Sequence, residues 1–298
     1  MAHRGGYALK NKMNNKLINL APLLFLAFAS RAAVPYGTAP RQTGDLLLPA
    51  GEITAATPKI LLIHGGGWTS EKYLRGTLSD EAALFRDAGF AVYNIDYRLA
   101  PAAAWPAIGD DCLVAARKLI SCEGMPELAA AAGKPIAVLG ASAGGHLALM
   151  TGLRLQRKNV FGVISVSGIA DPEQDSKDHP ARYKALFAGG PIEPKAFPEA
   201  HLSPDAPPIL FTHCRHDTVV PIASPMKLAR EMAGRRLHAE TYFYDLGRKN
   251  QGHAIWDVSD KKRHVLYPDI RERCLKFLRD VRDLPQPPPF PIDHPLKD

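Results

Sequence analysis

The sequence predicts an α/β fold in which a mostly parallel β-sheet is covered by helices on both faces. The expected strands are apolar along their whole length, which is typical of strands buried on both faces of a parallel sheet. Amphipathic helices separate these strands, and parallel neighbours need such crossover connections. The chain has 298 residues and 46% apolar content, enough for one sizeable core.

The first half of the chain alternates in this way. KILLIH (residues 59–64) predicts a strand, and SDEAALFRDAGF (79–90) predicts a helix that is capped by Ser79 or Asp80 and stops at Gly89. AVYNIDY (91–97) predicts a second strand, and GDDCLVAARKLI (109–120) predicts a second helix.

The second half continues the pattern. Strands are predicted at PIAVLG (135–140), VFGVISVSG (160–168), PPILFTHC (207–214) and AETYFYDL (239–246). Helices are predicted at GGHLALMTGLRL (144–155), SPMKLAREMAG (224–234) and a long closing segment from Lys261 to Val281.

Two segments interrupt the alternation. Residues 169–205 are rich in proline and charge and lie between two strands, so we expect a surface excursion or a small cap near the carboxyl edge of the sheet. Residues 284–298 are too rich in proline for a helix or a central strand and are expected to form a tail. Residues 33–283 are therefore expected to form one domain.

The N-terminal segment has the features of an export signal. Residues 1–31 hold five basic side chains and no acidic one, so the formal charge of +7 falls to +2 without them. A basic start leads to the apolar run Leu17–Phe28 and then to small residues, and this run is too short for a comfortable membrane span. We expect a signal peptide at residues 1–32, cleaved near Ala29 or Ala32. An uncleaved membrane anchor is the alternative.

The expected location is therefore secreted or periplasmic, with no stable membrane insertion after the signal is cleaved. The rest of the chain is nearly balanced in charge and has no basic run with interleaved aromatic residues. Nucleic-acid binding is accordingly not expected.

A short motif connects the third predicted strand to the helix after it. GASAG (residues 140–144) fits G-x-S-x-G, and a strand before it and a helix after it are the context in which this motif exposes a nucleophile. The turn strains the serine backbone and places the hydroxyl at the positive end of a helix. Ser142 is the predicted nucleophile.

A serine hydroxyl needs a base and a residue that orients the base. Asp217 directly follows a predicted strand, and His253 lies in the loop after the next strand. Ser142, Asp217 and His253 occur in the chain order expected of an α/β-hydrolase triad. His264 is the rival base, but it falls within the predicted closing helix, whereas a triad base usually lies on a loop.

The segment HGGGW, His64–Trp68, follows the strand at residues 59–64. Successive glycines let backbone N–H groups point into a cavity, so we predict an oxyanion hole formed by the amides of Gly66, Gly67 and Ala143. His64 is expected to fix the shape of this loop by hydrogen bonding. Trp68 either lines a substrate pocket or packs in the core.

The remaining histidines are expected to have structural roles. His213 and His216 flank Asp217, but no second cluster of ligands with suitable spacing accompanies them, so no metal site is predicted. His146 is expected to pack under the nucleophile turn. The chain also contains no phosphate-binding loop, dinucleotide fingerprint or H-E-x-x-H motif, and no cofactor is expected.

Two further pairs are interpreted structurally. Asp96 and Arg98 are expected to form an internal ion pair that anchors a loop. Cys112 and Cys122 would lie about 15 Å apart on one helix, too far for a disulfide bond.

Six segments together resemble the α/β-hydrolase esterases of the hormone-sensitive-lipase-like clan. They are HGGGW, NIDYRLAP, WPAIGDDC, GASAGGHLA, HCRHDTVVP and the GH that contains His253. The chain most resembles the exported bacterial branch of feruloyl and acetyl esterases, over roughly residues 36–282. The resemblance implies the triad Ser142, Asp217 and His253 and a carboxylesterase acting on a short-chain acyl, acetyl or feruloyl ester. The substrate would be a small molecule or be linked to carbohydrate.

The chain departs from the clan pattern at three places. Ala141 stands where the clan usually has an acidic residue, the mature N-terminus near Ala33 is too short for a helical cap, and the loop before His253 is longer and more polar. Two other functions stay open. One is an exopeptidase or arylformamidase that uses the same triad, and the other is a non-catalytic binding module with a hydrolase fold. The sequence leaves the oligomeric state and the acyl and alcohol specificity undetermined.

Overall fold

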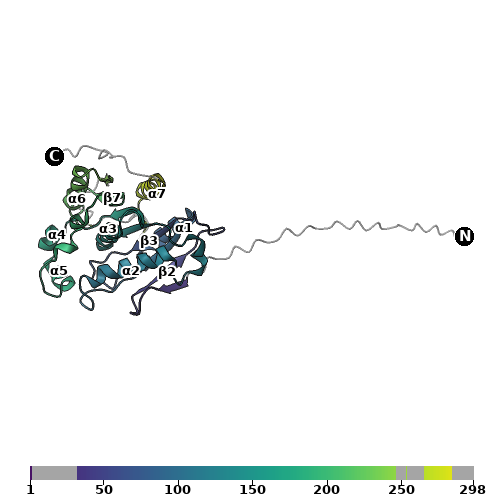
Figure 1. Cartoon of the computed structure of the whole chain (residues 1–298), viewed down its shortest axis with the longest axis horizontal. Helices are drawn as coiled ribbons and strands as arrows, with labels where there is room; N and C mark the ends of the chain where they lie inside the picture. Colours follow the sequence, from purple (N-terminus) through teal and green to yellow (C-terminus); the bar gives the residue numbers. More distant parts are fainter. Residues whose placement is uncertain (2–31, 246–252, 254–264, 284–298) are drawn as a thin grey trace.

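The computed structural model describes Met1, residues 32–245, His253 and residues 265–283 (Figure 1). Residues 2–31 of the predicted signal peptide, the rival base His264 and the predicted tail lie outside these residues. The described part contains an eight-stranded sheet with the order β1-β2-β4-β3-β5-β6-β7-β8. None of its helices combines the length and the apolar character needed to cross a bilayer.

The six predicted strands form the parallel part of the sheet. The whole sheet consists of β1 (Ala32–Pro35), β2 (Thr43–Leu47), β3 (Lys59–Ile63), β4 (Ala91–Ile95), β5 (Ile136–Ala141), β6 (Val160–Val166), β7 (Ile209–Cys214) and β8 (Ala239–Tyr244), and the predicted strands are β3 to β8. Strands β3 to β8 pair in parallel, which confirms the predicted fold class. Strands β1 and β2, which the sequence did not predict, add an antiparallel edge. Ala32, placed in the predicted signal peptide, begins β1 and pairs with Leu46.

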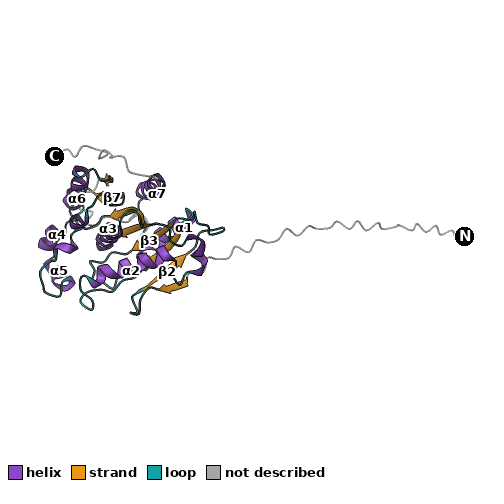
Figure 2. Ribbon diagram, in the orientation of Figure 1, coloured by secondary structure: helices purple, strands orange, loops and turns teal. Residues whose placement is uncertain are grey.

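Helices cover both faces of this sheet (Figure 2). They are α1 (Ser79–Asp87), α2 (Ala107–Ser121), α3 (Ala143–Leu155), α4 (Pro172–Asp178), α5 (Pro180–Leu186), α6 (Ala223–Gly234) and α7 (Pro268–Arg282), with short 3₁₀ helices at Arg75–Leu78, Pro126–Ala131, Pro194–Ala196 and Pro198–His201. Apolar residues of α1 and α7 join one buried cluster, and those of α2, α3 and α6 join another. The sheet therefore separates two cores.

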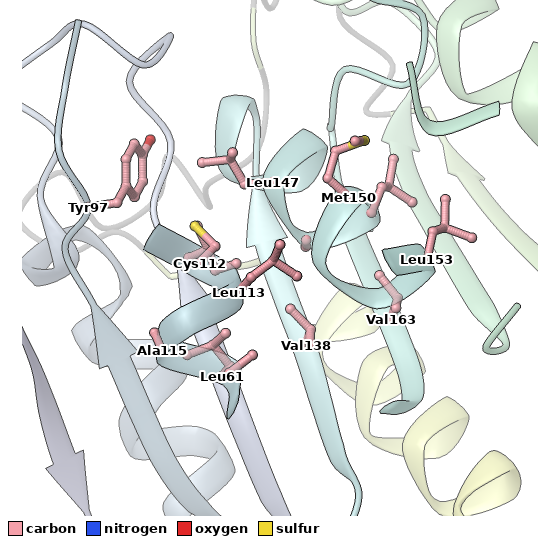
Figure 3. Packing of buried hydrophobic residues seen from close by; sticks show 14 of the residues in the cluster. Leu61, Tyr97, Cys112, Leu113, Ala115, Val138, Leu147, Met150, Leu153 and Val163 are labelled. Carbon is pink, nitrogen blue, oxygen red and sulfur yellow. The ribbon is translucent and has the colours of Figure 1, made fainter. Parts of the chain in front are cut away.

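Alternate residues of the central strand β3 enter these two cores. Ile60 and Leu62 belong to the cluster with α1 and α7, whereas Leu61 and Ile63 belong to the other. Figure 3 shows the second core, where side chains from the sheet lie close to those of α2 and α3 (Leu61, Val138, Val163; Leu113, Leu147, Leu153). Burial on both faces explains why the strands are apolar throughout.

The start of α7 and the cap of α1 differ from the prediction. The closing helix α7 begins at Pro268 rather than at Lys261, because a proline disfavours helical backbone in the residue before it. Tyr267 is accordingly extended, and Pro268 occupies the first turn, where its missing N–H costs no hydrogen bond. Helix α1 continues directly from a 3₁₀ turn, so its N-cap is Leu78 and neither Ser79 nor Asp80 caps it.

The predicted ion pair between Asp96 and Arg98 was wrong. Arg98 instead binds Asp111, with 2.6 Å between Nη2 and Oδ1, and Asp96 binds Arg75. Helix α2 begins at Ala107, two residues earlier than predicted, and Asp111 is buried in it and needs a cationic partner.

The four cysteines are buried and none of them is in a disulfide bond, in agreement with the prediction for Cys112 and Cys122. Cys122 does not share the helix with Cys112 but ends it, as a C-cap in the left-handed conformation.

Residues 169–205 form a small cap of α4, α5 and two 3₁₀ turns (Figure 1). Asp171 caps α4 by accepting a hydrogen bond from the Gln174 amide. The 3₁₀ turn Pro198–His201 packs against α3, and the Leu186 carbonyl accepts a hydrogen bond from the Trp105 amide. The cap is thus anchored beside the helix that follows Ser142.

Candidate active site

Ser142 lies in the turn between β5 and α3 and has a strained backbone. Its φ and ψ are 57° and −123°, a region that non-glycine residues occupy at a cost of about 1–3 kcal/mol. Its amide donates to the Val166 carbonyl on β6 at 2.9 Å, and its carbonyl accepts from the Gly145 amide at 2.8 Å. Contacts on both sides of the turn therefore hold the strained residue.

The two glycines of the G-x-S-x-G motif allow backbone segments to come together. A Cβ on Gly140 would lie 2.0 Å from the Gly144 carbonyl oxygen, and one on Gly144 would lie 2.2 Å from the Ile63 oxygen. Only glycine fits at either position because the atoms in the way belong to the backbone.

We expect Gly144→Ala to destabilise the protein by about 3 kcal/mol or more, or to prevent soluble folding, because the clashing backbone cannot move aside. Gly234→Ala in α6 is the matched control, since nothing lies within 4 Å of its added Cβ. Urea unfolding of both variants measures the difference. A midpoint for Gly144→Ala equal to that of the wild type would show that the turn relaxes easily.

Asp217 and His253 are in direct contact. The Asp217 Oδ2 lies 2.7 Å from the His253 Nδ1, and Oδ1 accepts from the amides of Val219 and Val220 at 2.9 Å each. Burial alone would raise the pKa of Asp217, but the hydrogen bonds from His253 and Val220 outweigh it and leave this pKa below its usual value. The carboxyl group is thus held charged and oriented, so that the His253 Nδ1 carries the shared proton.

Ser142 and His253 line one cavity of about 510 Å³ at the carboxyl edge of the sheet. The buried Nε2 of His253 has no hydrogen-bond partner in the described part of the chain. The other described residues that line it are Gly65, Gly66, Gly67, Thr69, Ser70, Tyr73, Thr77, Ala141, Arg182 and Val219. The structure thus brings the three predicted triad residues to one place, with Asp217 in contact with His253.

The glycine loop borders the same cavity. Gly66 and Gly67 have φ values of 103° and 58°, which glycine adopts at little cost. The Gly66 carbonyl accepts from the amides of Thr69 and Ser70, so the Gly67 N–H, in the same peptide plane, points the opposite way. Ala143 is the first residue of α3, so its amide has no partner within the helix.

His64 and Trp68 lie behind this loop. His64 donates from Nδ1 to the Gly65 carbonyl at 2.7 Å, and its ring stacks on Tyr97 at 4.4 Å, which agrees with the expected role in shaping the loop. Trp68 is fully buried, lies 5.4 Å from the His146 ring and 5.5 Å from the Tyr183 ring, and does not line the cavity. Trp68 therefore packs in the core.

The other histidines near Asp217 and Ser142 bind backbone or surface partners, although the His213 Nε2 also lies 3.5 Å from the Asp217 Oδ2. His213 is buried and donates from Nε2 to the Val220 carbonyl at 2.8 Å, whereas the exposed His216 pairs with Asp245. His146 is buried and donates from Nε2 to the Ala196 carbonyl, as expected of a packing residue. The described residues contain no group of three or more His, Cys, Asp and Glu side chains that could hold a metal ion.

Three buried histidines make stability dependent on pH. Burial lowers the pKa of His64, His146 and His213 to about 4 each. An unfolded histidine titrates near pH 6.5, so between pH 6.5 and 4 the unfolded chain binds more protons than the folded one. The contribution of these histidines to the free energy of unfolding therefore falls as the pH falls through this window, by up to about 1.4 kcal/mol per pH unit for each histidine.

We expect His146→Gln to reduce the number of protons taken up on unfolding in this pH window by about one, which makes the free energy of unfolding less dependent on pH. Urea unfolding at pH 7, 6 and 5 measures it, and His216→Gln at the surface is the control. An unchanged slope in His146→Gln would mean that His146 is protonated in the folded protein.

Arg182 is the charged residue among the described cavity residues that the sequence did not predict. Arg182 of α5 lies in the charged segment 169–205, where nothing in the sequence distinguishes it from its neighbours. Its position depends on how the cap folds back over the sheet edge.

Comparison with known proteins identifies the family. The BD-FAE family model matches residues 45–232, more than half of the chain. The chain belongs to the BD-FAE family. The match includes Ser142 and Asp217 and ends before His253.

The relatives of this BD-FAE member are esterases by name. Esterase LipC of Mycobacterium tuberculosis is 28% identical over 223 residues, which are 65% of this chain and 53% of LipC. Versiconal hemiacetal acetate esterase stcI of Emericella nidulans is 31% identical over 134 residues, 42% of each chain. The chain spans about half or less of the length of these curated relatives.

Solved structures agree on the fold. Esterase B from Lactobacillus rhamnosis matches with a TM-score of 0.68 and 21% identity over 84% of each chain. The predicted α/β-hydrolase fold and the resemblance to hormone-sensitive-lipase-like esterases are both confirmed.

Proposed function

We propose that this BD-FAE family member is a carboxylesterase that hydrolyses esters with Ser142, His253 and Asp217. The observation that carries the proposal is the shared cavity of Ser142 and the unpartnered His253 Nε2, with Asp217 bound to the far nitrogen of the same ring. A nucleophile, a base and a residue that orients the base are the parts that acyl transfer needs.

The reaction follows from this arrangement. The Ser142 Oγ attacks the ester carbonyl carbon while the His253 Nε2 takes the hydroxyl proton. The tetrahedral intermediate then collapses, the C–O bond to the alcohol breaks, and His253 returns the proton to the leaving alcohol. Water, deprotonated by the same nitrogen, then attacks the acyl carbon. The bond from this carbon to the Ser142 Oγ breaks, His253 returns the proton to Oγ, and the acid leaves. Asp217 stabilises the imidazolium at each stage.

The oxyanion is assigned to the amides of Gly66, Gly67 and Ala143. Gly66 and Gly67 line the cavity beside Ser142, and the Ala143 amide is free of helix hydrogen bonds at the positive end of α3. Each lost donor of this kind costs on the order of 100-fold in kcat.

The proposed substrates are esters of short acyl, acetyl or feruloyl groups, including those carried on carbohydrate. A cavity of about 510 Å³ has room for a small acyl group and part of an alcohol. One solved structure with the same fold is a carbohydrate esterase from gut microbiota.

The experiment is hydrolysis of p-nitrophenyl acetate by the purified protein, before and after treatment with a phosphonate that esterifies active serines. Hydrolysis that stops in step with labelling of the peptide containing Ser142 supports the proposal. Full activity after complete labelling, or a label on another residue, would overturn it.

We also propose that the protein is exported and that the signal is removed near Ala29. The basic and apolar pattern of the N-terminal segment supports export. Cleavage there leaves β1 whole, whereas cleavage after Ala32 would remove its first residue. The N-terminal residue of protein recovered outside the cytoplasm tests both points.

A further inference from the structure

The cavity contains a positive charge that ester hydrolysis alone does not require. Arg182 lines its wall, and a Cβ on Gly67 would lie 3.0 Å from the Arg182 Nε and 3.3 Å from its Cδ. The arginine side chain therefore rests on the glycine loop, beside the place assigned to the reacting carbonyl. Among the described residues that line this cavity, all except Arg182 and His253 are uncharged.

The positive charge of Arg182 is only partly neutralised by Asp175, its acidic neighbour. The Arg182 Nη1 lies 3.5 Å from the Asp175 Oδ2, which is long for a hydrogen bond. Asp175 is 2% exposed and does not line the cavity. No other acceptor in the described part of the chain binds the guanidinium, although it carries five N–H donors.

A carboxylate fits these unused donors. Its two oxygens lie in one plane and accept two parallel hydrogen bonds from a guanidinium, a pairing that is stronger than one between neutral groups. The side chain of Arg182 is only 21% exposed, so water screens its charge incompletely. The hydroxyls of Thr69, Ser70 and Thr77 line the same cavity and can bind the remaining polar atoms of a substrate.

We propose that the preferred esters carry a carboxylate, which Arg182 binds while Ser142 attacks the ester. The inference rests on the proposed ester hydrolysis and specifies its substrate class. The carboxylate can belong to the acyl part, as in a half-ester of a dicarboxylic acid, or to the alcohol part, as in an acylated acidic sugar or phenolic acid.

Two matched pairs of esters test the proposal and distinguish these sources. The acyl pair is mono-p-nitrophenyl adipate and its methyl ester. The alcohol pair is 4-acetoxybenzoate and methyl 4-acetoxybenzoate. The neutral member of each pair has a methyl ester in place of the carboxylate and is otherwise identical. We expect kcat/KM to be about tenfold or more higher for the charged member of at least one pair.

Variants assign the preference to Arg182. Arg182→Met is expected to remove the preference, and Arg182→Lys to retain part of it because the charge remains. Arg154→Met is the control. Arg154 pairs with Asp110, does not line the cavity, and should leave the preference unchanged. The wild-type preference should also decrease with added salt.

Two outcomes would overturn the proposal. One is a wild-type enzyme that does not prefer the charged member of either pair, a result that needs no folded variant. The other is a decrease in kcat/KM of Arg182→Met that is equal for both members of a pair. Such a decrease would place Arg182 at the reacting carbonyl instead.

Failure of the proposed function gives a different result, because then none of the four esters is hydrolysed. Calorimetric binding of 4-hydroxybenzoate against 4-hydroxybenzamide still tests Arg182 in that case. Binding of the acid that is about tenfold tighter in the wild type and absent in Arg182→Met supports the carboxylate site. Equal binding of the two compounds overturns it.

Discussion

Ser142→Ala is expected to lower kcat for ester hydrolysis by about 10⁵- to 10⁶-fold. The Ser142 Oγ is the atom that bonds to the acyl group. No other described lining residue places a hydroxyl in the strained turn between β5 and α3. Alanine keeps the backbone strain of the turn, so the stability of this variant should match that of the wild type within about 0.5 kcal/mol.

Ser142→Gly separates catalysis from stability at the same position. Glycine accepts φ and ψ of 57° and −123° without the penalty of a Cβ, so the variant should be about 1–3 kcal/mol more stable than the wild type and equally inactive. Kinetics with p-nitrophenyl acetate and urea unfolding measure the two effects. Retention of more than about one hundredth of the wild-type kcat in either variant would contradict the assignment of Ser142.

The central sheet was predictable because its signal is local. The strands from β3 to β7 are largely apolar and buried along their whole length, whereas β8 at the edge of the sheet is only partly buried. The edge strands β1 and β2 carry no such signal. They have only four and five residues, and their sequences AAVP and TGDLL contain proline, glycine and aspartate, which are poor strand formers. Strand β2 pairs with β4, far along the chain, and β1 pairs in turn with β2.

Residues of the site could be predicted when they follow strands directly. Ser142 and the glycine loop each follow a parallel strand, and the carboxyl ends of parallel strands meet at one edge. Side-chain pairing was harder to predict. Asp96 and Arg98 are two residues apart in sequence, but Arg98 pairs with Asp111 on α2 instead. Arg182 joins the site only because the cap brings α5 to the glycine loop.

Asp217→Asn is expected to lower kcat by about 10⁴-fold and to leave the fold intact. The amides of Val219 and Val220 hold the Oδ1 at 2.9 Å, and an asparagine oxygen can accept both hydrogen bonds. Its NH₂ group then faces the His253 Nδ1, which must become the acceptor, so the ring proton moves to Nε2. With a proton there, His253 cannot take the proton of Ser142.

The chain offers a matched control for this change. His216 and Asp245 form a second His–Asp pair at the surface, with 3.3 Å between Nε2 and Oδ2, and Asp245→Asn should leave kcat within about twofold. His253→Ala and His264→Ala extend the comparison to the two candidate bases. Loss of activity in His253→Ala alone agrees with the contact to Asp217. Loss of activity in His264→Ala, together with a normal kcat in Asp217→Asn, would identify His264 as the base. The Asp217–His253 hydrogen bond would then have a purely structural role.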